Sequence, residues 1–338
     1  MTTICIYPPQ TGLGGPASFS GRLAQALINR GIEVQSNPLA PGCAAVLVIG
    51  GSKRLDLLRR ARQRGVRIVQ RLNGMNWLHR KLDTGFKHFL RSEINNWLLS
   101  VIRSRLADRI IYQSNFSQEW WQKVRGPVNA AGTVIYNGVD LRTFSPQELE
   151  ERPSDHYRLL LVEGHLGGGM VSGLRNAVDL LHELGNDSGP RWELMVAGDA
   201  PISVRRQLEQ RYPGFWITWA GVLPPGQVPA LDRSAHALFS ADINAACPNS
   251  VVEAFACGLP VIAYATGALP EMVTGTAGCI VPYGSNYWKL ENPVISPLAD
   301  AARQVVREQN KYRPGARARA EEMFDIQNVV NSYLDVLL

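Results

Sequence analysis

The sequence predicts an α/β fold built from two Rossmann-like parallel-sheet domains. Short apolar runs that suit buried strands alternate with helical patterns along the whole chain, which is typical of repeated β–α–β units. A chain of 338 residues also exceeds what one hydrophobic core usually serves. The polar stretch 145–155 (SPQELEERPSD) interrupts the alternation, and an apolar strand at 159–162 restarts it. We therefore expect one domain on each side of this linker.

The first domain opens with a strand, a glycine-rich turn and a helix. The strand is predicted at 3–7 and the helix at 17–30, and the turn between them contains Gly14 and Gly15. Glycines allow the backbone to approach a ligand closely and allow N–H groups to face a phosphate or hydroxyl. This makes Gly14 and Gly15 candidate binding residues, although similar turns occur in unrelated nucleotide-binding folds.

Polar residues follow the central strand predicted at 66–70. Ligands bind at the carboxyl ends of strands in open parallel sheets, and Asn73 is a polar candidate at that position. A helical period covers 94–106. The remaining strands of this domain are predicted at 32–34, 45–49, 109–112 and 133–135.

In the second domain, a glycine-rich loop follows the first strand. Gly167, Gly168 and Gly169 can form a backbone nest for a phosphate, and His165 can carry a proton. A helical segment is expected at 316–338 after the last strands. Those strands are predicted at 193–198, 215–220, 237–240 and 259–264.

The stretch 249–273 (NSVVEAFACGLPVIAYATGALPEMV) predicts a buried helix, a glycine stop, a short strand and a second helix start. Ser250 and Glu253 have the spacing of a capping box. Gly258 suits a left-handed position after the helix. The helix opens after Pro248, and its free N–H groups and dipole favour an anion there.

This stretch resembles the donor-site signature of retaining GT-B glycosyltransferases, family 4 in particular. The run from Glu253 to Ala263 (EAFACGLPVIA) carries the likeness, with Gly267, Pro270 and Glu271 after it. A second marker is the run NGVDLRTF at 137–144. The resemblance implies two Rossmann-like domains facing a central cleft. It places the acceptor-side domain at 1–145 and the nucleotide-sugar donor domain at 146–315. A closing helix at 316–338 crosses back to the first domain.

The resemblance also implies roles for individual residues. Glu253 matches the glutamate that binds the donor ribose, Asn73 stands where the family often has a histidine facing the donor sugar, and His165 stands where it has an arginine. The set implied to bind the donor is Gly14, Gly15, Gly167, Gly168, Gly169, Gly221, Val222, Asn244, Pro248, Asn249, Ser250 and Glu253.

Three positions depart from the family pattern. Ala245 replaces the first glutamate of the signature, which leaves Asn244 or Asn249 to supply a hydrogen bond to the sugar. His165 and Met170 replace the arginine and lysine that neutralise the donor diphosphate. These losses put stabilisation of the leaving group in doubt.

The net charge is split unevenly along the chain. Residues 1–150 carry 20 Lys and Arg against 9 Asp and Glu, and much of this excess lies between 53 and 109. A solvated helix face explains such a charge, as does an anionic membrane surface or an anionic lipid-linked acceptor. Nucleic acid is not expected, because no binding motif accompanies the charge.

Composition indicates where in the cell the protein is expected and whether a metal or cofactor is expected. Five scattered cysteines with no CxxC pair predict a reduced, cytoplasmic protein, and the charge adds the inner membrane face as a peripheral location. No signal peptide or membrane span is expected. No His/Cys cluster is present, so we expect neither a metal nor a cofactor, with a nucleotide-diphospho-sugar as donor substrate.

Three functions remain open at this point. The first is a retaining, metal-independent transfer of a sugar from a nucleotide-diphospho-sugar to an acceptor hydroxyl on a glycan, a lipid-linked molecule or another compound. The second is a degenerate GT-B protein that binds a partner or a glycan without turnover. The third is an NAD(P) dehydrogenase, for which Gly12, Gly14, Ala17 and Glu33 loosely fit the fingerprint. Pro16 and the later motifs argue against the third.

Overall fold

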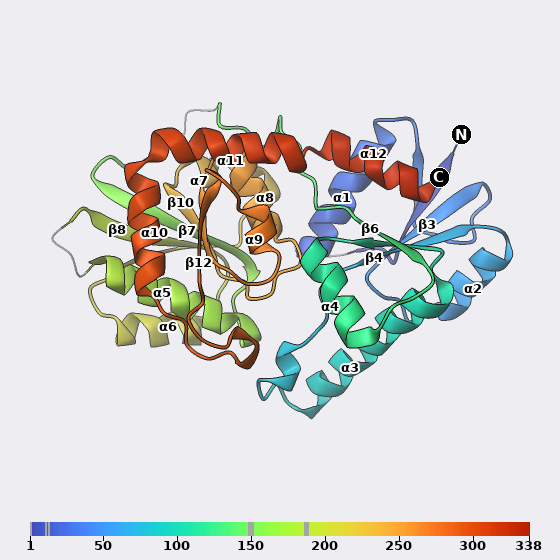
Figure 1. Cartoon of the computed structure of the whole chain (residues 1–338), viewed down its shortest axis with the longest axis horizontal. Helices are drawn as coiled ribbons and strands as arrows, with labels where there is room; N and C mark the ends of the chain where they lie inside the picture. Colours follow the sequence, from blue (N-terminus) through green and yellow to red (C-terminus); the bar gives the residue numbers. More distant parts are fainter. Residues whose placement is uncertain (1, 11, 13, 148–151, 186–188) are drawn as a thin grey trace. The chain divides into compact units, whose positions relative to one another are not determined.

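The computed structural model describes residues 2–10, 12, 14–147, 152–185 and 189–338. It divides into two compact units (Figure 1). Unit 1 contains residues 1–140 and 324–338, and unit 2 contains residues 141–323. Within the described residues, none of the helices is long and apolar enough to cross a membrane.

Unit 1 is built on a six-stranded parallel sheet in the order β2-β1-β3-β4-β5-β6. Its central strands read as continuous apolar runs because helices cover both faces of the sheet. The strands are β1 (Thr3–Tyr7), β2 (Glu33–Gln35), β3 (Cys43–Ile49), β4 (Arg67–Leu72), β5 (Arg109–Tyr112) and β6 (Ala131–Val134). They confirm the parallel sheet predicted for the first domain.

The helix predicted at 17–30 is confirmed as α1 (Gly15–Ile28), which begins and ends two residues earlier. The helix predicted at 94–106 is instead a longer α-helix, α3, followed by a π-helical turn at Ile102–Leu106. The apolar period is clearest in its second half because the outer face of the first half also carries apolar residues. The other helices are α1 (Gly15–Ile28), α2 (Leu55–Gln63), α3 (Phe86–Val101), α4 (Asn115–Arg125) and α12 (Ile326–Leu337), with a short 3-10 helix η1 (Leu78–Arg80).

The C-terminal helix α12 packs against α1, β3 and β4 and completes the core of unit 1 (Figure 1). Gly138 makes this docking possible, since a Cβ there would lie 2.8 Å from the Ile326 side chain. The Val139 N–H donates to the carbonyl of Phe324 at 2.8 Å, and the Ile326 N–H donates to the carbonyl of Val139 at 3.0 Å. The NGVD run therefore anchors the C-terminal helix.

Unit 2 has a second six-stranded parallel sheet, in the order β12-β11-β10-β7-β8-β9. Strands β7 and β10 are neighbours at its centre, where Leu238 pairs with Leu160. The strands are β7 (His156–His165), β8 (Arg191–Asp199), β9 (Trp216–Gly221), β10 (Ala237–Ser240), β11 (Val261–Tyr264) and β12 (Gly278–Val281). The two parallel sheets confirm the predicted fold class.

Helices cover both faces of the unit 2 sheet, and α11 packs along the buried helix α8. The α-helices are α5 (Val171–Gly185), α6 (Ile202–Arg211), α7 (Val228–Arg233), α8 (Asn249–Ala256), α9 (Leu269–Met272), α10 (Ser296–Arg307) and α11 (Gln309–Met323). Short 3-10 helices are η3 (Gly168–Met170), η4 (Pro225–Gln227) and η5 (Tyr287–Lys289).

The segment predicted as one helix at 316–338 is helical, but it forms parts of two helices rather than one. α11 ends at Met323, and the Asp325 carboxylate caps α12 by accepting from the Gln327 N–H at 2.9 Å. An aspartate with extended backbone stops one helix and starts the next.

The compact units divide five residues before the predicted boundary at 145 and eight residues after the one at 315. Residues 141–144 belong to unit 2 because Arg317 on α11 donates to the carbonyls of Leu141 and Phe144. Residues 148–151 of the predicted linker lie outside the described residues.

Candidate functional site

In unit 2, the predicted site residues gather at the carboxyl end of the sheet. His165 ends β7, Gly221 ends β9, and the segment 241–248 connects the end of β10 to α8. Parallel strands place their carboxyl ends along one edge, which is where ligands bind in open α/β sheets. The order β10-β7-β8-β9 therefore brings residues of distant sequence positions to one edge.

The glycine loop after β7 forms the 3-10 helix η3 ahead of α5. A Cβ at Gly167 would lie 2.7 Å from the ring of His165, so this exposed side chain would have to turn away. Gly168 is required by its backbone, with φ of +56°, and nothing lies within 4 Å of where its Cβ would be. The space beside Gly168 is thus open to a ligand.

His165 and Met170 supply no fixed positive charge to this loop. The His165 side chain is 62% exposed, and its Nδ1 lies 3.2 Å from the equally exposed carboxylate of Asp199. A Met170 side chain carries no charge at any pH. In the structure as in the sequence, neither position supplies the fixed positive charge that the family's arginine and lysine provide.

Asn244 is the most unusual backbone position of this edge. It has φ of +62°, a conformation that residues other than glycine rarely adopt. Its side chain is buried, and neither the amide nitrogen nor the amide oxygen has a hydrogen-bond partner among the described residues. The segment is held by Gly267, whose missing side chain lets the backbone of Ala245 approach, and by the Ala268 N–H bond to the Ala245 carbonyl at 2.9 Å.

Helix α8 corrects the predicted capping box. The helix begins at Asn249 with Pro248 as its N-cap, and no side chain caps it. Ser250 lies inside the first turn, where its hydroxyl cannot serve as the cap that the Ser-x-x-Glu spacing predicts. The start of α8 therefore has no side-chain cap, and Glu253 is buried within the helix.

Two carboxyl groups that the sequence analysis missed lie at the same edge. Glu163 is near the end of β7, and Asp242 follows the end of the adjacent β10. Burial, followed by the negative charge of Asp242, raises the pKa of Glu163 to about 8. Burial also raises the pKa of Asp242 to about 6. At neutral pH, Glu163 is therefore mostly protonated and can donate a hydrogen bond.

Gly221 and Val222 end the edge strand β9. Gly221 has φ of +69°, and a Cβ there would meet nothing within 4 Å. The Val222 side chain is 51% exposed. Their main-chain groups lie on an open rim at the carboxyl end of this sheet.

In unit 1, Gly14, Gly15 and Asn73 also lie at the carboxyl end of their sheet. Gly14 is the N-cap of α1, and the Gly14 carbonyl accepts from the Ala17 and Ser18 N–H groups at 3.0 and 3.1 Å. The nearest atom to a Cβ at Gly14 would be 4.0 Å away. The start of α1 is thus unobstructed at Gly14.

Asn73 has a fixed orientation. Its Oδ1 accepts from Arg71 and from Gln113, each at 2.7 Å, and its carbonyl accepts from the indole N–H of Trp121 at 2.9 Å. With the oxygen occupied twice, the amide N–H₂ group is the part that can donate to a ligand.

Arg71 positions Asn73 and also ties it to the C-terminal helix. Its guanidinium is 1% exposed, donates to Tyr333 on α12 at 3.1 Å and to Asn137, and lies 3.7 Å over the Phe19 ring. The sequence shows Arg71 only as a basic residue in a strand, since its partners come from distant segments.

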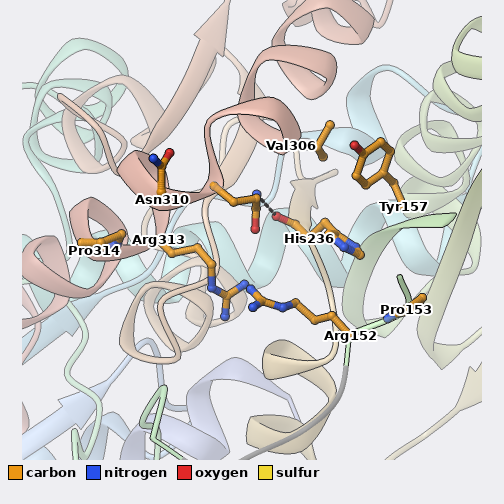
Figure 2. Close-up of a pocket in the computed structure, with 9 residues that line it drawn as sticks. Arg152, Pro153, Tyr157, His236, Val306, Asn310, Arg313 and Pro314 are labelled. Atoms are coloured by element: carbon orange, nitrogen blue, oxygen red, sulfur yellow. Dashed lines mark hydrogen bonds between the residues drawn. The ribbon is translucent and has the colours of Figure 1, made fainter. Parts of the chain in front are cut away.

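A separate pocket of about 600 Å³ lies at the amino end of the unit 2 sheet (Figure 2). Arg152 and Arg313 point toward one another there, near His236. Burial, followed by the charge of Arg152, lowers the pKa of Arg313 to about 10. The described residues that line it are Arg152, Pro153, Tyr157, His236, Val306, Gln309, Asn310, Arg313 and Pro314.

The carboxyl end of the unit 2 sheet lies within a part of the chain that matches a known family. The family described as glycosyl transferases group 1 matches residues 161–303, which include the glycine loop, β10 and α8. A GDP-mannose-dependent alpha-(1-6)-phosphatidylinositol dimannoside mannosyltransferase from Mycobacterium tuberculosis is 28% identical over 276 residues. The match covers 77% of this chain, and the chain spans 66% of that relative's length.

Solved structures share the fold of the whole chain. A sucrose-phosphate synthase from Thermosynechococcus elongatus has a TM-score of 0.75 at 15% identity, covering 99% of this chain and 98% of its own. Anabaena HepE in complex with UDP-glucose has a TM-score of 0.71 at 17% identity, covering 100% of this chain and 99% of its own.

Proposed function

The chain belongs to the group 1 glycosyltransferases of the GT-B fold, and on this premise we propose that it transfers a sugar from a nucleotide-diphospho-sugar to an acceptor hydroxyl. We further propose that the transfer retains the anomeric configuration and needs no metal ion. One observation carries the proposal most strongly. The strained, buried Asn244 amide lacks a partner among the described residues and lies at the edge where the family's donor signature begins.

Residues at the carboxyl end of the unit 2 sheet contact different parts of the donor in this proposal. The N–H groups that open α8 after Pro248 and the backbone of Gly167–Gly169 stabilise the departing diphosphate. Glu253 binds the ribose, and Asn244 bonds to the sugar in the place of the absent glutamate at Ala245. Main-chain groups of Gly221 and Val222 hold the base.

Neutral Glu163 adds a hydrogen-bond donor to this edge. Its raised pKa keeps the proton on the carboxyl near pH 7, so that it offers a donor rather than a repelling charge to the phosphates. The leaving phosphate oxygen then takes the proton of the attacking acceptor hydroxyl on the same face. Asn73, whose Oδ1 is already bonded to Arg71 and Gln113, is proposed to contact the donor sugar through its N–H₂ group.

The relatives support a nucleotide-diphospho-sugar donor. The Mycobacterium relative is named for GDP-mannose, and the HepE structure contains UDP-glucose. The same relative is named for a phosphatidylinositol dimannoside acceptor. Together with the excess of basic residues in 1–150, this supports a lipid-linked or otherwise anionic acceptor and a peripheral position at the inner membrane face.

Calorimetric binding of UDP, GDP, ADP and their common sugar conjugates tests the donor site. We expect selective binding of one base, weakened at least tenfold by Glu253→Ala and unchanged by Glu308→Ala, an exposed control. Proton NMR of the product then tests retention through the configuration of the new bond. A folded protein that binds none of these nucleotides would overturn the proposal.

A second candidate function is a GT-B protein that binds without turnover. The specific observation in its favour is that the edge holds two carboxyl groups while residues 165 and 170 are not arginine or lysine. If this second function is correct, the folded protein shows no calorimetric binding of UDP, GDP, ADP or their sugar conjugates.

A further inference from the structure

Helix α3 exposes an apolar face. Most of the exposed large apolar side chains in the described part of unit 1 lie on this helix and in the turn before it. Phe86 is 79% exposed and Trp97 is 56% exposed. The other members are Leu82, Phe89, Leu90 and Ile94. Scattered single apolar residues are normal on a surface, but a group of this size on one helix is not.

The spacing of these residues places them on one side of α3. Phe86, Leu90, Ile94 and Trp97 follow one another at intervals of four, four and three residues, which is the period of a helix face. We name this set the α3 apolar face. It is continuous because each member lies about one turn from the next.

Polar contacts on the flank of the α3 apolar face fix the rotation of α3. The Asn96 side chain bonds to the backbone of Asn76 in both directions, at 2.8 and 3.0 Å. Glu93 accepts from Arg80 at 2.6 and 2.8 Å and lies 2.7 Å from the buried His79 ring. These bonds hold the α3 apolar face outward.

Positive charges flank the α3 apolar face. Lys81, Lys87 and Arg91 are exposed, and within the described part of the chain they form no ion pair. The one acidic residue on α3, Glu93, is already bonded to Arg80. A lipid bilayer with anionic headgroups matches this combination, since aromatic and aliphatic side chains enter the interface while lysine and arginine contact phosphates.

Helix α2 carries more charge but lacks the apolar component. Its Leu58 and Ala61 side chains are buried against the sheet, and two of the nearby arginines pair with acids, Arg54 with Asp56 and Arg62 with Asp108. Charge alone therefore attracts α2 to a surface, whereas α3 can also insert.

We propose that α3 is the membrane-docking element of this protein, lying in the plane of an anionic bilayer with its apolar face in the interface. This deepens the membrane-side position proposed above and rests on it for its biological setting. The docking itself requires neither donor binding nor sugar transfer.

Vesicle co-sedimentation tests the proposal directly. The full chain is incubated with sucrose-loaded vesicles of phosphatidylcholine containing 30% phosphatidylglycerol, and with pure phosphatidylcholine. We expect binding to the anionic vesicles, reduced at least tenfold in partition coefficient by Phe86→Ser combined with Trp97→Ser. Lys87→Glu combined with Arg91→Glu should reduce it at least fivefold, and 0.5 M NaCl should weaken the wild type.

Two matched controls distinguish membrane insertion of α3 from nonspecific hydrophobic adsorption and from electrostatic attraction alone. Ile28→Ser combined with Val124→Ser removes exposed apolar residues of unit 1 away from α3 and should leave binding unchanged. Arg59→Gln combined with Arg60→Gln on α2 should change it less than twofold. Thermal melting of every variant confirms that each is folded.

The outcomes are distinguishable from those of the donor-site experiment. Equal vesicle binding by the Phe86/Trp97 variant and the wild type would overturn the proposal, and so would a greater loss in the α2 variant. A wild type that self-associates in sedimentation velocity, with the Phe86/Trp97 variant monomeric and vesicle binding absent, would assign the face to a second copy instead. Nucleotide binding by calorimetry is expected to be the same in all these variants.

Discussion

The two ends of the unit 2 sheet hold ionisable groups of opposite kind, carboxyl groups at the carboxyl end and basic groups at the amino end. At the carboxyl end, Glu163 and Asp242 have raised pKa values, first through burial. At the amino end, Arg313 has a lowered pKa, also first through burial, and burial lowers the pKa of His236 to about 4. Both ends thus hold groups whose charged forms the fold disfavours.

A third charged cluster in the same unit shows what a purely structural arrangement looks like. The buried Glu193 accepts from Arg158 and Thr218, each at 2.6 Å, and contacts His156 at 3.1 Å. Although burial raises its pKa, these hydrogen bonds outweigh burial and leave it below the usual value. Every strong partner is present, as expected of a buried charge that only supports the fold.

The comparison with Glu193 indicates where the protein's own groups leave polar side chains for a ligand to contact. Shifted carboxyl groups, an unpartnered amide and open glycines coincide at the carboxyl end, and perturbed groups of this kind cluster at functional sites. The arginine pair that would suit a diphosphate lies at the amino end of the sheet, the opposite end from the donor signature.

The largest effect is expected from Gly173→Ala on α5. A Cβ at this position would lie 2.4 Å from the carbonyl oxygen of Ala241, next to Asp242, so α5 must move away from the end of β10. Overpacking of this kind costs about 3 kcal/mol, and we expect that loss in the free energy of unfolding measured by urea denaturation. Nucleotide affinity should fall with it.

Gly226→Ala is the matched control for Gly173→Ala. A Cβ at Gly226 would meet nothing within 4 Å, and its φ is not positive, so the change should stay within about 0.5 kcal/mol. Equal stability of the two variants would show that the carboxyl end tolerates separation of α5 from β10.

The second effect is a pH dependence that Glu163→Gln removes. Glu163 in the folded protein keeps its proton up to about pH 8, while in the unfolded chain it loses the proton near the ordinary glutamate pKa of 4.5. The folded state therefore binds more protons in this window, and the free energy of unfolding falls as the pH rises. Between pH 6 and 8 the wild type should lose about 2 kcal/mol, and Glu163→Gln should lose little.

Asp242 provides an internal comparison, because its pKa of about 6 limits its own contribution to lower pH. In Glu163→Gln, the free energy of unfolding should still decrease as the pH rises toward 6, but it should change little above pH 6. Asp300→Asn, at an exposed carboxylate on α10, should follow the wild type throughout. A wild-type stability that is flat from pH 6 to 8 would contradict the shared burial of the two acids.

The fold could be predicted from the sequence because its signals are local. Buried parallel strands show as short apolar runs, and all six strands of unit 1 and five of the six strands of unit 2 overlap predicted runs. The capping box failed for a local reason as well, since Pro248 occupies the cap position and Ser250 lies two residues after it. The break at Asp325 was missed because the helical period continues on both sides of it.

The missing parts of the candidate site depend on distant pairs. Glu163 and Asp242 become one feature only because β7 and β10 are neighbours in the sheet. Arg71 becomes the support of Asn73 only when Asn137 and Tyr333 reach it. A weak local signal did exist for the first pair, since each acid directly follows an apolar strand run.

The smallest effect comes from restoring positive charge at the donor edge, and it tests the comparison of the two ends most directly. His165→Arg combined with Met170→Lys places two cations beside the glycine loop, where charge-assisted hydrogen bonds to a diphosphate become available. We expect about tenfold tighter nucleotide diphosphate binding, or about 1.4 kcal/mol, with a stronger dependence on salt. Arg152→Gln at the amino end changes the charge of the same unit by one and should leave that affinity unchanged. If Arg152→Gln weakened nucleotide binding while the double variant had no effect, the diphosphate would belong to the amino-end pocket, and the assignment of the two ends would have to be reversed.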